Sequence, residues 1–523
     1  MEKQSLIKGS IILGFAGILA KILGVFFRWP IIMLLGDEGV GYYQMPFPMY
    51  MIFIAFVGGI PIAVSKLVSE SIARGNENES FEIMRQALIF ITILALGMST
   101  ILIIGAKTII NFLKWDPKVY FSFIAMALAP LMVSFVTAYR GFFQGMQNMY
   151  PTAISQVLEQ VGRVLAGVGL AWVLLPYGIG YAAGGAALGA GIGGILGGLY
   201  LHIKYSKIKR RSKVKVKFIN KKIMDKIFKI AVPIGLGMLV SNLMTLADSI
   251  LIPQLLLKAG FSNNEITVLF AQFSGKANVL VNLPLSLSVA LSSSLIPIIA
   301  EHYALKQFRQ LKNKITISMK FSFIIAFPSF LGLFFLARPI LDLIFPGQGS
   351  GYDILKYLSI SIPFIIICQT TTSVLQACDK LKQPIIFLLL GVIIKVILTI
   401  YLVPINTLGI YGAIIATIIG YSIPAMLNSL YMKFMIKNEL MEKNIDYFDV
   451  MAKPAMASLI MIISVMFSYI YIIGAGKSMK IASLISISLG IIIYLLLILI
   501  LGIFKNDYIK NKFNKRWNTL KRR

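Results

Sequence analysis

The sequence predicts an all-α protein that crosses a membrane many times. Of its 523 residues, 58% are hydrophobic and only 14% are charged, and the mean hydropathy is +0.82. Soluble domains carry about 25% charged residues, so this composition excludes a soluble globular enzyme. Apolar runs of roughly 20 residues, the length that a helix needs to cross the hydrocarbon core, recur along the chain. With 2 cysteines, a disulfide scaffold is also excluded.

About fourteen apolar stretches are long enough to cross a membrane as helices. The first of them is too long for the apolar part of a signal peptide, and no small-residue cleavage site closes it. An even number of spans places both chain ends on the same side. The expected spans are 9–35, 43–65, 87–106, 119–139, 151–175, 180–203, 230–257, 268–300, 315–337, 352–378, 384–403, 409–432, 452–474 and 480–504.

Lysine and arginine gather on one side of these spans. The net charge is +29, and roughly 37 basic residues fall in the termini and alternate loops, against roughly 8 in the opposite loops. By the positive-inside rule both termini and the long basic loop 204–229 are cytoplasmic. We interpret that loop as a topology determinant that touches anionic lipid, with a regulatory or nucleic-acid role as the alternative.

The chain resembles itself at an offset of about 231 residues. The segment 143–145 before Pro151 parallels 375–377 before Pro384. The repeat predicts two pseudo-symmetric six-helix lobes with substrate bound between them. The alternative is that the matches only reflect basic residues and prolines, which recur in the loops of any polytopic protein. The expected domains are an N-lobe at 1–210, a basic cytoplasmic linker at 211–229, a C-lobe at 230–437, two extra helices at 438–504 and a basic cytoplasmic tail at 505–523.

The first span carries a small cationic face. Five residues follow one another at intervals of 3, 4, 3 and 4, which places them on one side of a helix. They are Gly14, Gly17, Lys21, Gly24 and Arg28. A charge at mid-bilayer costs roughly 2.5–3.5 kcal/mol, so both cations should face a water-filled cavity or a partner. We interpret the face as an anion site. The alternative is that Arg28 reaches the outer membrane interface and Lys21 alone lies deep.

The eighth span adds a third cation. Gln272 and Lys276 are spaced i, i+4, and the repeat places this helix beside the cavity between the lobes. Three cations without a nearby acid indicate an anionic ligand, and a diphosphate has matching charge. The sequence therefore assigns Lys21, Arg28, Lys276 and Gln272 to substrate binding in a central cavity.

Other polar residues inside the spans have structural interpretations. Gln156, Glu159 and Arg163 form a stripe on the fifth span, where Glu159 and Arg163 are spaced to pair as structural or gating groups. Asp248 of the seventh span either couples transport to a cation or proton, or forms an ion pair with Lys395.

Three glycine-containing segments are expected to break helices. Asp37 and Glu38 lie in the sequence Gly-Asp-Glu-Gly-Val-Gly, which turn chemistry explains better than catalysis does. The segment 139–145 is expected to be a helix terminus and turn on the cytoplasmic side, with a gating loop as the alternative. The Gly-Gly-Ile-Pro segment at 58–61 should interrupt or bend the second span, since proline removes a backbone donor.

Several segments together resemble a known family. They are Leu35–Tyr42, Pro61–Glu70, Arg140–Gly145 with Asn148 and Pro151, Ser155–Gln160, Leu175–Ile179 and Gly275–Ala277 with Leu283-Pro284. They are similar to the stage V sporulation protein B group, in the polysaccharide-biosynthesis branch of the multidrug/oligosaccharidyl-lipid/polysaccharide exporter superfamily. The resemblance covers most of the first lobe and the start of the second.

The resemblance implies a fourteen-helix transporter with two lobes and a cationic cavity. Relatives flip lipid-linked cell-wall precursors such as lipid II, an undecaprenyl-diphosphate sugar-peptide. Basic residues on helices 1, 2 and 8 are functional in those flippases: Lys21 and Arg28 match helix 1, Lys276 matches helix 8, and Lys66 is the nearest candidate for helix 2. Some relatives bind sodium between helices 7 and 11, near Asp248 here. In this family, the last two helices form a groove for the lipid tail.

We therefore expect a flippase of an undecaprenyl-diphosphate-linked cell-wall or polysaccharide precursor, acting by alternating access in the bacterial inner membrane. It is expected to be no enzyme and to bind no metal, cofactor or nucleic acid, with sodium or proton coupling left open. It should be a monomer among membrane lipids, with the cell-wall synthesis machinery as a further partner. The alternatives are a cation-coupled multidrug exporter of the same superfamily and a non-transporting enzyme or scaffold of cell-wall synthesis.

Overall fold

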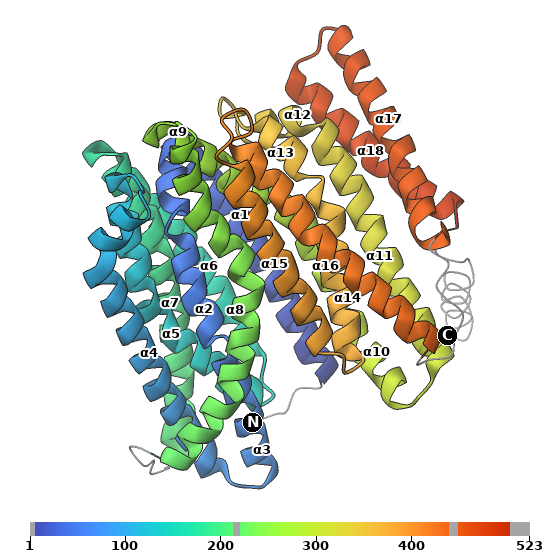
Figure 1. The fold of residues 1–523 in the computed structure, drawn as a ribbon. Helices are drawn as coiled ribbons and strands as arrows, with labels where there is room; N and C mark the ends of the chain where they lie inside the picture. Colours follow the sequence, from blue (N-terminus) through green and yellow to red (C-terminus); the bar gives the residue numbers. More distant parts are fainter. Residues whose placement is uncertain (1–5, 213–219, 439–447, 503–523) are drawn as a thin grey trace, which may run out of the picture. The chain divides into compact units, whose positions relative to one another are not determined.

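The computed structural model describes residues 6–212, 220–438 and 448–502, and every regular element within those ranges is a helix (Figure 1). This confirms the all-α prediction. Ten helices of the described chain are long and apolar enough to cross a membrane, or up to 11 if the bent pair α13–α14 is one span. The protein is a multi-pass membrane protein. The expected count of fourteen spans stays a prediction.

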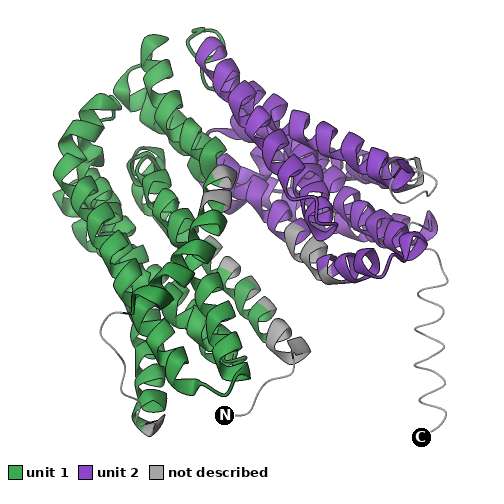
Figure 2. Cartoon of the chain, turned by 60° about the horizontal axis from the view of Figure 1, so that its bottom comes forward, with its two compact units in different colours: residues 1–275, 403–410 green, residues 276–402, 411–523 purple. Residues whose placement is uncertain are grey.

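The helices group into two compact units, drawn in different colours in Figure 2. Unit 1 comprises Met1–Gly275 and Val403–Ile410, and unit 2 comprises Lys276–Leu402 and Tyr411–Arg523. The elements of unit 1 are α1 (Leu6–Gln44), α2 (Phe47–Val57), α3 (Gly59–Ala73), α4 (Glu77–Phe112), η1 (Pro117–Val119), α5 (Tyr120–Gly145), α6 (Tyr150–Leu174), η2 (Leu175–Tyr177), α7 (Ile179–Ser212), α8 (Lys221–Lys258) and α9 (Asn263–Phe270).

The boundary between the units falls inside a π-helix, η3 (Ala271–Ala277), which continues α9 into α10. The elements of unit 2 are α10 (Asn278–Ala304), α11 (Phe308–Phe335), α12 (Ala337–Ile344), α13 (Tyr352–Leu358), α14 (Ser361–Ala377), α15 (Lys382–Leu402), α16 (Ile410–Asn438), η4 (Phe448–Ala452), α17 (Lys453–Gly474) and α18 (Met479–Ile500).

Helix α8 belongs to unit 1, whereas the sequence places 230–257 in the C-lobe. It packs closely on α3, because a methyl group at Gly59 would overlap the carbonyl oxygen of Ala231. The second half of the expected linker is also helical. The Asn220 side chain caps the first turn of α8 and donates to Glu82 Oε2 of α4 at 3.0 Å. The lobe boundaries drawn from the internal repeat stay a prediction.

The predicted interruption of the second span is confirmed. Helix α2 ends at Val57, Gly58 caps it, and α3 begins at Gly59. Together the two helices form one apolar stretch, Phe47–Ala73. Gly58 itself keeps helical φ and ψ of −61° and −22°, so the interruption is confined to one residue, three positions before Pro61.

Helices α6 and α7 of unit 1 approach each other through glycines. A methyl group at Gly193 of α7 would overlap the carbonyl oxygen of Glu159 and lie 2.9 Å from the backbone nitrogen of Arg163. Because α6 backbone atoms fill that space, no side chain fits between the two helices there. This close approach fixes the position of Glu159 and Arg163, which both lie on α6.

Gly193→Ala should therefore lower the free energy of unfolding by about 1–3 kcal/mol, the usual cost of overpacking. Gly169→Ala on α6 is the matched control, since a methyl group there meets nothing within 4 Å. Alanine favours helix over glycine at both positions. Thermal unfolding of the two purified variants checks this: equal unfolding temperatures would contradict the close approach.

In unit 2, the last two helices pack on its other helices through a local apolar cluster. Leu331, Ala457 and Val465 are among its buried members. The Tyr494 hydroxyl of α18 donates to the carbonyl oxygen of Ile324 in α11 at 2.8 Å. Helices α17 and α18 thus form part of a packed unit.

Candidate functional site

Helix α1 carries Arg28 into the interior of unit 1. The Arg28 side chain is partly buried, and its Nη1 donates to the carbonyl oxygen of Gly275 at 3.4 Å. Its electrostatic neighbours are Tyr43 and a second guanidinium, Arg163. Among the residues that the structure describes, Arg28 has no carboxylate partner. The positive charge of this side chain is therefore not neutralised by a neighbouring acid.

Lys21 lies on the same helix, but its side chain is outside the described residues. Further along α1, Gly24 lies toward α6. A methyl group at Gly24 would lie 4.0 Å from Gln160 Oε1, and Phe27 packs against Gly167. The role of Lys21 in binding stays a prediction.

Lys276 lies in the π-helix η3 of unit 2, with 1% of its surface exposed. Its Nζ donates to the Gln348 carbonyl oxygen at 2.6 Å, and it lies 3.4 Å from both Ser350 O and Ser350 Oγ. These oxygens belong to the loop between α12 and α13 and carry no net charge. They solvate the buried ammonium group.

Gln272, assigned to substrate binding from the sequence, has a buried partner in unit 1. Its Nε2 donates to Asp37 Oδ2 of α1 at 2.8 Å, and each residue is 8% exposed. This bond ties η3 to α1. In the described state the amide nitrogen of Gln272 is thus engaged within the protein, and its role in binding stays a prediction.

The expected turn in the segment that holds Asp37 and Glu38 is present, but it is confined to Gly36. Helix α1 continues to Gln44 and is kinked at Gly36, where φ is 60° and ψ is −170°. Glycine adopts that positive φ without a steric penalty. Asp37 and Glu38 lie in the helical segment that follows this break, so the turn is confined to Gly36 and the expected first span, 9–35, ends at it.

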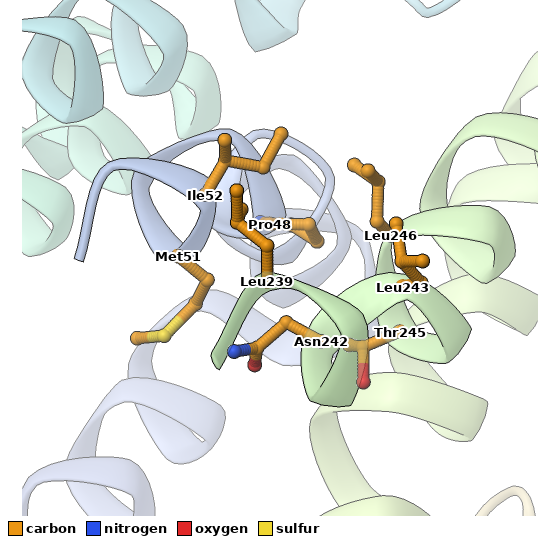
Figure 3. A pocket seen from close by; sticks show the side chains of 8 residues that line it. All are labelled: Pro48, Met51, Ile52, Leu239, Asn242, Leu243, Thr245 and Leu246. Carbon is orange, nitrogen blue, oxygen red and sulfur yellow. The ribbon is translucent and has the colours of Figure 1, made fainter. Parts of the chain in front are cut away.

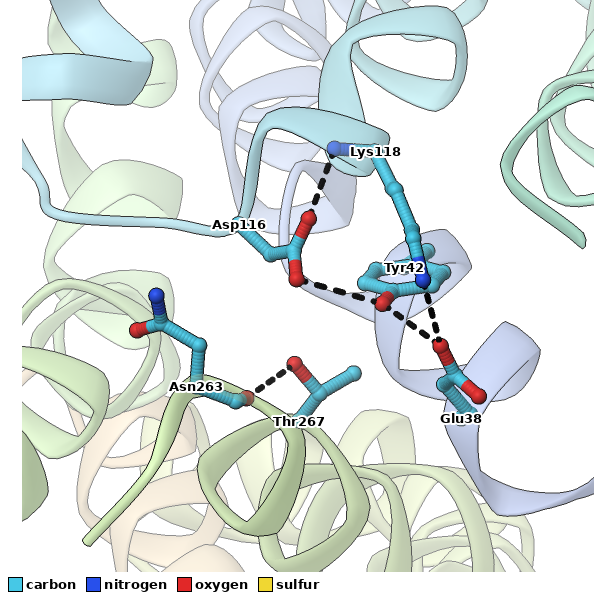
Figure 4. A network of polar contacts seen from close by, with 6 residues as sticks. All are labelled: Glu38, Tyr42, Asp116, Lys118, Asn263 and Thr267. Carbon is cyan, nitrogen blue, oxygen red and sulfur yellow. Dashed lines mark hydrogen bonds and ion pairs between the residues drawn. The ribbon is translucent and has the colours of Figure 1, made fainter.

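Glu38 belongs to a polar network at the end of unit 1 where α1 ends (Figure 4). The Tyr42 hydroxyl lies 2.8 Å from Glu38 Oε1 and 3.3 Å from Asp116 Oδ2, although it has a single proton to donate. Lys118 Nζ pairs with Glu38 at 3.2 Å. The network links α1 to η1 across 74 positions of sequence, a separation that no local pattern in the sequence reveals.

Helix α9 begins beside this network with a capping box. The N–H and the hydroxyl of Ser262 each donate to Glu265 Oε2 at 2.8 Å. These two hydrogen bonds hold the pKa of the exposed Glu265 carboxyl below its usual range. Helix α9 then packs on α1 so closely that a methyl group at Gly41 would lie 2.5 Å from the Thr267 carbonyl oxygen.

The segment 139–145 forms a helix terminus, as expected: α5 remains helical to Gly145, and the turn follows at 146–147. Its glycines permit close packing on α3: a methyl group at Gly141 would lie 2.6 Å from the Pro61 carbonyl oxygen. Arg140 therefore projects from a helix into unit 1. The sequence reading missed this residue, because a glycine-rich segment resembles a turn as much as a helix contact.

Arg140 provides the ion pair that the structure shows for Glu159. Its Nη2 lies 2.8 Å from Glu159 Oε2, with side chains 18% and 12% exposed. Its Nε donates to Ser155 Oγ at 2.9 Å. Arg163, the expected partner of Glu159, is an electrostatic neighbour, but it also faces Tyr50. The two arginines thus share one carboxylate.

Glu159→Gln should lower the free energy of unfolding by about 1.5–3 kcal/mol, since it removes a hydrogen-bonded charge pair and leaves Arg140 uncompensated. Asp225→Asn is the control, because its pair with Lys229 is 61% and 74% exposed and should contribute about 1 kcal/mol or less. Chemical denaturation of both variants in detergent checks the difference. A Glu159 variant as stable as the control would show that the pair has no structural role.

A shallow pocket lies between α2 and α8 of unit 1 (Figure 3). Its cavity volume is only about 20 Å³. Its polar members are Asn242 and Thr245 of α8, and its other lining residues, which include Met51 and Leu243, are apolar. The Asn242 side chain donates to the Met238 carbonyl oxygen at 2.9 Å, so helix backbone occupies part of its bonding capacity.

Asp248 and Lys395 are both buried, at 7% and 1% exposure. Asp248 lies on α8 of unit 1 and Lys395 on α15 of unit 2. Their pairing, or the coupling of Asp248 to a cation, stays a prediction. The described residues contain no group of three or more His, Cys, Asp or Glu side chains arranged to hold a metal ion.

The fold defines a multi-pass membrane protein that carries arginines and acidic residues in the interior of unit 1. The chain belongs to the polysaccharide biosynthesis protein family, whose model matches residues 6–303. The MatE family model matches residues 233–401.

Named relatives agree with this membership. The chain is 27% identical over 438 residues to stage V sporulation protein B of Bacillus subtilis (strain 168), covering 82% of this chain and 84% of that protein. It is 27% identical over 451 residues to the lipid II flippase MurJ of the same organism, covering 80% of each. The structure of lipid II flippase MurJ in an inward closed conformation matches with a TM-score of 0.72 at 19% identity, covering 95% of this chain and 100% of that one. The chain is thus a membrane transporter of the flippase type.

Proposed function

We propose that the protein flips an undecaprenyl-diphosphate-linked cell-wall or polysaccharide precursor, such as lipid II, across the bacterial inner membrane. The observation that carries the proposal is the arginine pair of unit 1. Arg28 and Arg163 are electrostatic neighbours inside a bundle of apolar helices, and Arg28 has no carboxylate partner among the described residues. Like charges in such a place favour an anionic ligand, because a diphosphate neutralises both.

In this proposal Lys21, Arg28 and Lys276 hold the diphosphate while the protein alternates between inward and outward access. The oxygens of Gln348 and Ser350 that solvate the Lys276 ammonium are neutral. A phosphate oxygen would replace them with a stronger, charge-assisted bond. The lipid tail stays in the bilayer or against α17 and α18.

The direction of insertion and the energy source belong to the same proposal. Both termini face the cytoplasm, because basic residues concentrate on that side of the expected spans. Asp248 and Lys395 are buried charges and are the candidates for sodium or proton coupling. The protein acts without catalysing a covalent step, since its named relatives include a flippase.

Complementation tests this function against the alternatives. The gene, expressed in a bacterium depleted of its own lipid II flippase, should restore growth. Restored resistance to cationic drugs without restored growth would instead support a multidrug exporter. Covalent turnover of lipid II by the purified protein in detergent would support an enzyme. Either result would overturn the proposal.

A further inference from the structure

The α6 side chains that face α1 leave hydrogen-bonding capacity unused. Gln156, Gln160 and Arg163 are spaced i, i+4 and i+7, which places them along one face of the helix. The Oε1 atoms of both glutamines and the Nε of Arg163 are buried without a hydrogen-bond partner among the described residues. Leaving a buried polar atom unpaired costs about 1–3 kcal/mol, so three along one stripe indicate an absent partner.

This stripe faces the cationic side of α1. Gln160 Oε1 lies 4.0 Å from the position that a methyl group at Gly24 would occupy. Arg163 and Arg28 are electrostatic neighbours, as the surroundings of Arg28 show. The two helices therefore bring two guanidinium groups and the Gln160 amide into one region of unit 1, and Gln156 lies one turn further along the same face of α6.

The donors and acceptors in this region are separated along the helix. Arg163 is at one end of the stripe, and Gln156 is about 10 Å away along the axis. Guanidinium groups donate to phosphate oxygens, whereas amide oxygens accept from hydroxyl or N–H groups. A ligand that fills both ends has an anionic part followed by a part rich in hydroxyl or N–H donors.

We propose that α6 lines the anion site and recognises the first sugar of the ligand. Arg163 binds the diphosphate together with Arg28, and Gln156 and Gln160 accept hydrogen bonds from that sugar. This inference rests on the proposed function and extends it to specificity. The structure assigns Arg163 to the ligand as well as to Glu159, because Arg140 already pairs with that carboxylate at 2.8 Å. The diphosphate supplies affinity, and the glutamines distinguish a sugar-linked lipid from a bare one.

Two lipid probes separate these roles. Purified full-length protein in nanodiscs is titrated with undecaprenyl diphosphate and with the same lipid carrying one N-acetylated hexose. Arg163→Gln should weaken binding of both lipids about tenfold or more, the loss expected for a charge-assisted hydrogen bond. The double variant Gln156→Leu/Gln160→Leu should weaken only the sugar-linked lipid, by about tenfold, and leave the bare diphosphate within about twofold.

Gln254→Leu is the matched control, because its amide donates to the Phe112 carbonyl oxygen at an exposed site elsewhere in unit 1. It should change neither affinity. Thermal unfolding of each variant verifies folding, and Arg163→Lys, which keeps the charge, replaces Arg163→Gln if that variant does not fold.

The outcomes are distinct. Equal affinities of the double glutamine variant and the wild type for the sugar-linked lipid would assign the unpaired oxygens to water and overturn the inference. If the double variant loses equal affinity for both lipids, the assignment of the two glutamines to the sugar is likewise overturned. If the wild-type protein binds neither lipid, the proposed function itself fails, and this result is seen before any variant is compared.

Discussion

Replacing Lys21 and Arg28 together by alanine should abolish lipid flipping while the protein still inserts and folds. Each side chain is expected to donate a charge-assisted hydrogen bond to the diphosphate, worth about 1.5–3 kcal/mol. Loss of both removes about 3–6 kcal/mol of ligand stabilisation, which lowers the rate by about two to four orders of magnitude. Arg28 is the better supported member, since its guanidinium lies beside Arg163.

The measurement is complementation of a flippase-depleted strain, with protein in the membrane quantified by immunoblot. The control variant replaces two other cations, Lys222 and Lys226, which are exposed on the first turns of α8. Exposed charges contribute little to folding, so this control should grow like the wild type. Normal growth of the Lys21/Arg28 variant would show that the α1 cations do not bind the substrate.

Lys276→Met should cause the second large loss of transport, by about ten- to a hundredfold. Methionine keeps the length and apolar stem of lysine but removes the ammonium group that contacts Gln348 and Ser350. Flipping rates in liposomes measure the effect. Lys258→Met on the exposed last turn of α8 is the matched control and should transport normally.

A second variant separates binding from loop anchoring at this position. If Lys276 only holds the loop between α12 and α13, Ser350→Ala should reduce transport about as much as Lys276→Met does. The account predicts that Ser350→Ala transports within about threefold of the wild type, since the Gln348 carbonyl at 2.6 Å remains. Equal losses for the two variants would assign Lys276 to the loop.

Local sequence patterns predicted those features of the fold that depend on composition and spacing. The all-α architecture follows from apolar runs, and the break at Gly58 follows from a Gly-Gly-Ile-Pro segment that cannot maintain a regular helix. Asp37 and Glu38 show the limit of such patterns. The glycine-rich sequence predicts a turn, and the structure confines it to Gly36; the contacts of Asp37 with Gln272 and of Glu38 with Lys118, from distant parts of the chain, are not visible in the local pattern.

The site residues that the sequence missed have partners distant along the chain. Arg140 meets Glu159 from another helix, and Tyr42 meets Asp116 across 74 positions. An i, i+4 rule detects Glu159 and Arg163 on one face but cannot indicate which neighbouring helix contributes a competing cation. Helical periodicity places Gly24 and Arg28 on one face of α1, but it cannot indicate that Gln160 lies beside Gly24 or that Gly275 accepts from Arg28.

The most direct test of the central claim compares a charged and a neutral cargo in liposomes. Wild-type protein is reconstituted with a fluorescent undecaprenyl-diphosphate-linked hexosamine or with the same sugar joined to undecaprenol without phosphate, with and without a sodium or proton gradient. The account predicts protein-dependent flipping of the diphosphate lipid and none of the neutral one. Equal flipping of both lipids, or no flipping of the diphosphate lipid under any gradient, would contradict it.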